Sequence, residues 1–296
     1  MTGAVVAPEH ASRTGAPIWK LRQGIVSLAS PVVMGIINVT PDSFSDGGAY
    51  EEPQAALRRA RQMVLEGAGM IDVGGESTRP GAASVSVSEE AARVIPVIRL
   101  LKSELAVPVS VDTRKAAVAK AALAAGADVV NDISGLGDPE MAGVVAGEEA
   151  GLVLMHMRGT PATMQEDPSY EDVAMEVRDE LENALAKALA AGVDSARVVV
   201  DPGIGFAKNH DHNLRLLADL AVLHSLGQPL LLGVSRKAFI GTLLGGVAPS
   251  QRAVGTAAAC VVGLLAGARI FRAHDVRVVH EALTVAEAIR AAAPAA

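Results

Sequence analysis

Three polar residues end apolar segments in a way that suits a planar ligand. Asp112 ends VPVSVD, Asn131 lies in VVNDIS, and Asp201 stands between RVVV and PGIGF. A buried carboxylate is tolerated only when it is paired, and carboxylate and amide oxygens accept hydrogen bonds. Two carboxylates and an amide at equivalent places therefore favour a flat ligand whose edge is rich in N–H donors. For Asp201 alone, a capping role at the start of a loop is the alternative.

Basic residues end two later segments. Ser235, Arg236 and Lys237 follow PLLLGV and precede a helical stretch, and the N-terminus of a helix favours negative charge. Arg272 and His274 lie two residues apart in RIFRAH, hence on one face of a strand, and such a pair suits a phosphate or pyrophosphate. These segments indicate an anion site, although SRK by itself also fits a basic surface turn.

Two loops combine turn residues with polar side chains. NVTPDSFSDGG follows the first β-branched segment, and GGESTRPGA follows the second. Both are typical of mobile loops that close over an active site, with ordinary long turns as the alternative. Thr78 and Arg79 are candidate phosphate contacts in the second loop. Asn38 is a candidate Mg²⁺ ligand, because Mg²⁺ takes few protein ligands and relies on water and substrate phosphates.

These residues must be positioned by a repeating pattern of strands and helices. Short β-branched segments alternate with alanine- and leucine-rich segments from residue 31 onward, and we expect strands at 32–37, 70–74, 107–112, 128–133, 151–156, 197–201, 229–234 and 269–274. The pattern predicts an α/β fold, a single (β/α)8 TIM barrel over residues 29–296, after a loosely ordered N-terminal tail at 1–28. The C-terminal ends of barrel strands form the active-site face. An open doubly wound sheet is the main alternative.

The composition supports this architecture and excludes several classes of protein. Apolar residues make up 50% of the 296 residues and aromatic residues only 2%, which favours a core of Val, Ile, Leu and Ala. The net charge of −7 argues against a general nucleic-acid or membrane-surface binder. We expect no membrane span, and a cytoplasmic location because the first residues lack the order of a secretory signal.

Two further features carry no predicted chemistry. Cys260, the only cysteine, lies in the alanine-rich run GTAAACVVGLLAGA and is expected to be a small core residue. His210 and His212 form HDH at the start of a helical stretch, and no His/Cys cluster has the spacing of a zinc site.

Taken together, the motifs resemble those of the dihydropteroate synthases, which are pterin-binding TIM barrels. INVTPDSFSDGG, DVGGESTRPGA, VNDISG, LMHMRGTP, DPGIGFAKN, SRKAFIG and RAHD occur in the family's order between about residues 31 and 290. The resemblance implies a transferase of folate biosynthesis that condenses 6-hydroxymethyl-7,8-dihydropterin pyrophosphate with p-aminobenzoate. It also implies these two small molecules as substrates, Mg²⁺ as cofactor, a homodimer, and competition of sulfonamides with p-aminobenzoate.

The resemblance also assigns roles to the candidate residues. The pterin would be bound by Asp112, Asn131, Asp201 and Lys237. The pyrophosphate would be bound by Asn38, which also carries Mg²⁺, and by Thr78, Arg79, Arg272 and His274. The p-aminobenzoate pocket would be formed by Phe44, Pro80, Ser235 and Arg236. The implied catalytic residues are Asp112, Lys237, Arg272 and His274.

Ala238 departs from the family pattern, because members often carry a serine or another polar residue after the lysine of SRK. The departure weakens one contact with the p-aminobenzoate carboxylate, and backbone N–H groups could still donate hydrogen bonds to that carboxylate.

Two other functions compete with the synthase. One is a methyltetrahydrofolate-binding corrinoid methyltransferase domain, against which the basic groups of SRK and RAHD argue. The other is a non-catalytic pterin-binding paralogue, against which the intact loops argue.

Overall fold

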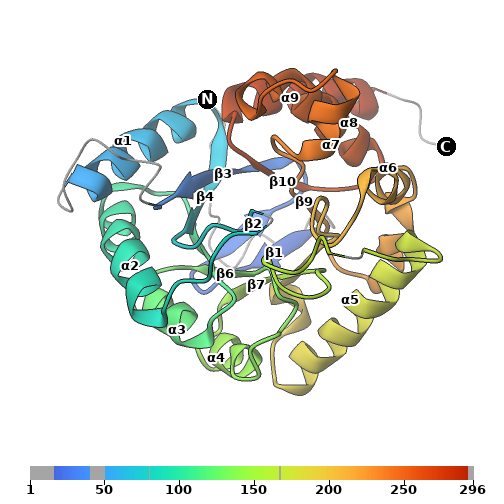
Figure 1. The fold of residues 1–296 in the computed structure, drawn as a ribbon. Helices are drawn as coiled ribbons and strands as arrows, with labels where there is room; N and C mark the ends of the chain where they lie inside the picture. The colour runs from blue at the N-terminus through green and yellow to red at the C-terminus, as the bar shows by residue number, and fades with distance from the viewer. Residues whose placement is uncertain (1–16, 41–50, 80, 167, 293–296) are drawn as a thin grey trace.

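The computed structural model describes residues 17–40, 51–79, 81–166 and 168–292. Its centre is a sheet of eight parallel strands, each overlapping a segment where the sequence predicts a strand (Figure 1). The strands are β3 (Val32–Asn38), β4 (Ala68–Gly74), β5 (Val109–Asp112), β6 (Val129–Asp132), β7 (Gly151–Met155), β8 (Val198–Asp201), β9 (Leu231–Leu232) and β10 (Ile270–Ala273). These Val-, Ile- and Leu-rich segments are almost entirely buried, as strands covered by helices must be.

The sheet closes into a barrel. The strand order is β8-β7-β6-β5-β4-β3-β10-β9. The two end strands meet through a parallel bridge between Val200 and Leu230, and Val200 N donates to Pro229 O at 3.0 Å. Helices surround the strands in Figure 1. The prediction of a TIM barrel is therefore confirmed, and the open doubly wound sheet is excluded.

The described residues form nine α-helices around the barrel, and local sequence fixes where several of them begin. Ser86 caps one helix by accepting from Glu89 N at 3.2 Å, and Asp172 caps another by accepting from Ala174 N at 3.1 Å. The α-helices are α1 (Glu51–Leu65), α2 (Val87–Glu104), α3 (Ala116–Ala124), α4 (Met141–Gly147), α5 (Val173–Ala190), α6 (His210–Ala218), α7 (Ala238–Leu243), α8 (Ala253–Leu265) and α9 (Val276–Ala291). Short 3-10 helices are η3 (Ser195–Arg197), η4 (Leu220–Leu226) and η5 (Pro249–Gln251).

Residues 17–28 differ from the loosely ordered tail expected from the sequence. β1 (Ile18–Lys20) and β2 (Ile25–Ser27) pair as an antiparallel hairpin. Trp19 is fully buried in the inner apolar cluster of the barrel, and its Nε1 donates to Arg197 O at 2.7 Å just before β8. Strands this short give a weak local signal, and burial against the barrel stabilises them instead.

Some predictions concern residues that the structure does not describe. Residues 1–16, the rest of the predicted tail, lie outside the described ranges. Phe44 and Pro80, which the family resemblance assigns to the p-aminobenzoate pocket, lie outside them as well. Among the helices that are described, none has the length and apolar character needed to cross a membrane.

Candidate active site

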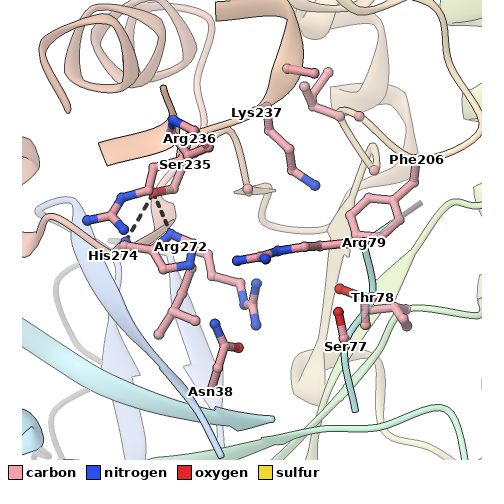
Figure 2. A pocket seen from close by; sticks show the side chains of 18 of the residues that line it. Asn38, Ser77, Thr78, Arg79, Phe206, Ser235, Arg236, Lys237, Arg272 and His274 are labelled. Carbon is pink, nitrogen blue, oxygen red and sulfur yellow. Dashed lines mark hydrogen bonds between the residues drawn. The ribbon is translucent and has the colours of Figure 1, made fainter. Parts of the chain in front are cut away.

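Most of the residues singled out from the sequence line one cavity of about 1320 Å³. Figure 2 shows several of them pointing into it from different loops. The lining includes Asn38, Thr78, Arg79, Asn131, Asp201, Ser235, Arg236, Lys237, Arg272 and His274. Asp112 lies directly beside this group, in contact with Arg272. The cavity therefore forms at the C-terminal ends of the strands.

Strand register explains why these residues meet. Asn38 pairs with Gly74, Gly74 with Asp112, and Asp112 with Asn131 along four neighbouring strands. Paired residues of neighbouring parallel strands lie side by side in the barrel wall. Polar strand ends that are far apart in the sequence therefore form one rim.

Asp201 and Asn131 provide buried hydrogen-bond acceptors. Asp201 Oδ1 accepts from Gly203 N at 2.8 Å, and among the described residues no donor reaches its Oδ2. Asn131 Nδ2 donates to Asp72 Oδ2 at 3.1 Å, which leaves its Oδ1 for a ligand. Burial raises the pKa of Asp201 to about 6. A ligand that donates hydrogen bonds here would offset the cost of burying that charge.

Arg272 is fixed by two buried carboxylates. Its Nε donates to Asp72 Oδ2 and its Nη2 donates to Asp112 Oδ2, each at 2.6 Å. Burial raises the pKa of Asp112 to about 7, although the Arg272 charge opposes that rise. Asp72 is missing from the predicted site because it lies inside β4 rather than at its end. The signal was present, since a carboxylate in the apolar segment MIDVG needs a buried partner.

Ser235 orients the imidazole of His274. Ser235 Oγ accepts from His274 N at 3.1 Å and lies 2.9 Å from His274 Nδ1. Burial, together with the charge of Arg272, lowers the pKa of His274 to about 3, so the ring is neutral at pH 7. When the hydroxyl donates to Nδ1, the ring proton lies on Nε2. His274 can then donate a hydrogen bond to an anion.

The two basic residues of SRK have different surroundings. Arg236 donates through Nε and Nη2 to the Asp275 carboxylate at 2.9 and 2.6 Å. Lys237 Nζ lies 3.7 Å from the centroid of the Phe206 ring and has no hydrogen-bond partner among the described residues. Burial lowers the pKa of Lys237 to about 8. The Lys237 ammonium is thus available to a ligand beside Phe206, which was not among the functional residues predicted from the sequence.

Glu76 anchors the loop that carries Thr78 and Arg79. Its carboxylate accepts from Val85 N at 3.1 Å and from Lys115 Nζ at 3.0 Å. Figure 2 shows Arg79 extending across the cavity from this loop. The anchored carboxylate explains how a loop of small and polar residues keeps Arg79 at the site.

The cavity carries more positive than negative charge. Its basic lining residues include Arg79, Lys208, Arg236, Lys237, Arg252 and Arg272. Asp201 is the only carboxylate in the lining among the described residues. The whole chain has the opposite sign, with a net charge of −7. This local reversal favours a ligand that carries several negative charges.

The donor groups do not form a metal cage. No cluster of three or more His, Cys, Asp or Glu side chains in the described part of the chain could hold a metal ion. Asn38 lines the cavity at the end of β3 and offers one neutral amide oxygen. That donor fits a cation such as Mg²⁺, which keeps most of its water and binds chiefly to substrate phosphates.

Known proteins share this sequence and fold. Residues 34–274 match a family model described as pterin binding enzyme. The chain is 48% identical over 265 residues to a dihydropteroate synthase of Escherichia coli, covering 89% of this chain and 93% of that protein. It is similar to Xanthomonas albilineans dihydropteroate synthase with 4-aminobenzoic acid, with a TM-score of 0.88 and 45% identity over 94% of this chain and 100% of that one. The same enzyme in complex with 7,8-dihydropteroate gives a TM-score of 0.85 and 43% identity at the same coverage.

Proposed function

This chain belongs to the dihydropteroate synthase family of pterin-binding enzymes, and we propose that it condenses 6-hydroxymethyl-7,8-dihydropterin pyrophosphate with p-aminobenzoate. The bond between the methylene carbon and the diphosphate oxygen breaks, and the amine nitrogen bonds to the same carbon. The products are 7,8-dihydropteroate and pyrophosphate, which takes up the proton lost by the amine. The observation that supports this reaction is one cavity that combines buried acceptors, such as Asp201, with a large excess of cations.

The pterin binds at the acceptors. Asp201 Oδ2 and Asn131 Oδ1 lack donors within the described protein, and they accept from the 2-amino group and the ring nitrogens. Lys237 contacts the carbonyl side of the ring next to Phe206. Asp112 holds the ring from nearby and stabilises positive charge on the exocyclic carbon.

The diphosphate binds at the cations. Thr78 and Arg79 approach it from the loop after β4, and Arg272 and the Nε2–H of neutral His274 approach it from the end of β10. The electron-rich dihydropterin supports a positive charge on its methylene carbon, so departure of the diphosphate precedes attack by the amine. The protein contributes mainly by stabilising the departing anion. Arg272 is already aligned by its carboxylate partners, so it needs no reorganisation during the reaction.

The p-aminobenzoate binds beside the start of α7. We propose that it is surrounded by Phe44, Pro80, Ser235 and Arg236, as the family resemblance implies. Because the Ser235 hydroxyl contacts His274 and the Arg236 guanidinium is held by Asp275, backbone N–H groups are the donors we expect for the carboxylate. 

The end of β3 would hold Mg²⁺ together with the bound diphosphate. Asn38 is the residue that would hold it, and the ion would partly neutralise the phosphate charge when bound. The cations of the chain and Mg²⁺ would then share the stabilisation of the leaving group.

Release of pyrophosphate tests the proposed function. Purified protein with both substrates and Mg²⁺ should release it, and omission of either substrate should stop the release. Sulfonamides, which mimic p-aminobenzoate, should raise the apparent KM for p-aminobenzoate without lowering kcat. No release with both substrates present would refute the proposal.

A corrinoid methyltransferase domain is the alternative enzyme. It would use the same acceptors for the pterin, but its methyl donor brings no diphosphate. The cations Arg79, Arg272 and Lys237 around the cavity therefore favour the synthase. Methyl transfer from methyltetrahydrofolate to a corrinoid, measured beside pyrophosphate release, distinguishes the two.

We also propose a homodimer and a cytoplasmic location. The neighbouring helices α7, α8 and α9 (Figure 1) expose the apolar side chains of Leu243, Val254, Val262, Leu265 and Ile289. A helix that covers a barrel normally presents a polar outer face, so this surface fits a second copy of the chain. Cell fractionation tests the proposed location.

A further inference from the structure

A buried lysine that the proposed reaction does not use lies behind the loop after β8. Lys208 is 2% exposed. Its Nζ donates to Gly203 O at 3.2 Å and to Phe206 O at 3.0 Å, and it lies 2.9 Å from His156 Nδ1. Burial lowers the pKa of Lys208 to about 7. In its ammonium form Lys208 has three protons and no acceptor, and all three protons are used within the protein.

His156 connects this ammonium to helix α5. An ammonium only donates, so when Lys208 is in that form His156 Nδ1 accepts and the ring proton lies on Nε2, which is 2.9 Å from Glu180 Oε2. Glu180 Oε1 accepts in turn from Arg158 Nε at 2.9 Å. Burial lowers the pKa of His156 to about 4, so the imidazole is neutral at pH 7. A carboxylate, a neutral imidazole and an ammonium thus form a continuous hydrogen-bonded chain from the helix to the loop.

The loop held by Lys208 carries groups that face the substrate cavity. Gly203 N donates to Asp201 Oδ1 at 2.8 Å, and the Phe206 ring contacts the Lys237 ammonium. The backbone is left-handed at Gly203 and at Ala207, with φ of 67° and 48°. An alanine rarely adopts that conformation, so the loop depends on its hydrogen bonds to keep it.

We propose that Lys208 is a positioning residue for pterin binding, oriented through His156 by Glu180. This inference rests on the proposed function, and it assigns Lys208 no contact with substrate. Without the ammonium, the buried carbonyl of Phe206 would lose its donor and that of Gly203 would keep only Phe206 N, which donates to it at 3.0 Å, so the loop would shift. Asp201 and Phe206 would then lose their alignment, while the cations around the diphosphate would keep theirs.

Substitution Lys208→Met tests the proposal, because methionine keeps the length of the side chain and removes its donors. The KM for the dihydropterin substrate should rise at least about tenfold, while kcat and the KM for p-aminobenzoate change by less than about twofold. The matched control is Lys102→Met. Lys102 donates to the buried Asp128 at 2.8 Å next to the N-terminal ends of the strands, so its loss should lower the melting temperature and leave both KM values unchanged.

Glu180→Ala keeps the proposal testable if Lys208→Met does not fold. The Glu180 side chain is 40% exposed, so its removal should be tolerated, and the KM for the dihydropterin should again rise selectively. A folded variant of either kind with an unchanged KM for the dihydropterin would overturn the proposal. Loss of kcat and of both affinities together would overturn it too. If the unsubstituted protein releases no pyrophosphate, the proposed function fails; if it does and the variants match it, only the role of Lys208 fails.

Discussion

At the scale of single residues, the site contains a buried carboxylate, Asp201, whose negative charge lowers the stability of the folded protein. Burial raises the pKa of Asp201 to about 6 from the usual 3.8. The native state therefore binds this proton more tightly than the unfolded state does. It follows that the contribution of Asp201 to stability decreases as the pH rises from about 4 to about 6 and stays reduced above that range. Asp201 is thus better explained by ligand binding than by stability.

Asp201→Asn should stabilise the protein at pH 8 and weaken pterin binding. The free energy of unfolding, measured in urea, should rise by up to ~3 kcal/mol at pH 8 and by much less at pH 4, because the charge is absent at low pH. The KM for the dihydropterin should rise by about tenfold or more, since a charged acceptor is lost.

Asp194→Asn is the control for this substitution. The Asp194 carboxylate accepts from Ala196 N at 3.0 Å near the N-terminal end of β8, and that hydrogen bond lowers its pKa. Its neutral variant should therefore lose stability at pH 8 and keep the KM. A destabilised Asp201→Asn with normal pterin binding would contradict the assigned role.

Ala238 allows a second test at this scale. It is the first residue of α7 and lines the cavity, at a position where the family resemblance implies a serine or another polar residue. Ala238→Ser should lower the KM for p-aminobenzoate severalfold, because the hydroxyl adds a donor for the carboxylate, and should leave the KM for the dihydropterin unchanged. Saturation curves for p-aminobenzoate that superimpose on those of the natural sequence would argue against this contact.

At the scale of elements, the strands bring polar residues to one end of the barrel, and the loops set the directions in which the side chains after the strands point. The loop after β8 shows this dependence most clearly. Gly203 packs so closely on β7 that a Cβ atom there would overlap the carbonyl oxygen of His156. The shape of this loop therefore depends on its neighbour and on the absence of a side chain.

Two glycines with the same φ allow the effect of crowding by neighbouring atoms to be separated from the effect of backbone strain. Gly203 and Gly227 both have φ of 67°, but a Cβ on Gly227 would meet no atom within 4 Å. Gly227→Ala should cost only the ~1 kcal/mol of a left-handed alanine and leave pyrophosphate release unchanged. Gly203→Ala should lower the melting temperature much further and raise the KM for the dihydropterin. If the two variants lowered the melting temperature equally, the close contact between Gly203 and the His156 carbonyl would have no effect on stability.

At the scale of the whole molecule, the two ends and the sides of the barrel have different tasks. The hairpin at residues 17–28 closes the N-terminal end with Trp19, while the C-terminal end stays open as the cavity. On one side, α8 exposes apolar residues outward although it also packs inward through Cys260 and Leu264. This two-sided helix is the basis for the proposed dimer.

Charges placed on that helix should separate the proposed dimer. Val254 and Val262 are 77% and 51% exposed, so the variant Val254→Glu/Val262→Glu should fold normally and become monomeric in light scattering at micromolar concentration. Leu189→Glu on α5, where the leucine is 41% exposed, should leave the oligomeric state unchanged. If the unsubstituted protein is already monomeric in light scattering, the proposed homodimer is wrong.

The sequence by itself determined the positions of the eight strands and the polar groups at their ends. Both are local properties: β-branched runs favour strands, and Asp112, Asn131 and Asp201 directly follow or end such runs. Residues inside a strand or behind a loop were missed for the same reason. Asp72 and Lys208 have meaning only through partners elsewhere in the chain.

Only the tertiary structure decided those partnerships. Arg272 pairs with Asp72, which lies 200 residues away, and Lys208 meets His156 across 52 residues. The buried Trp19 likewise depends on Arg197, 178 residues along the chain. Such contacts follow from barrel closure and strand register, which are set by packing of the whole chain, so a short stretch of sequence can show that a buried charge needs a partner but cannot identify that partner.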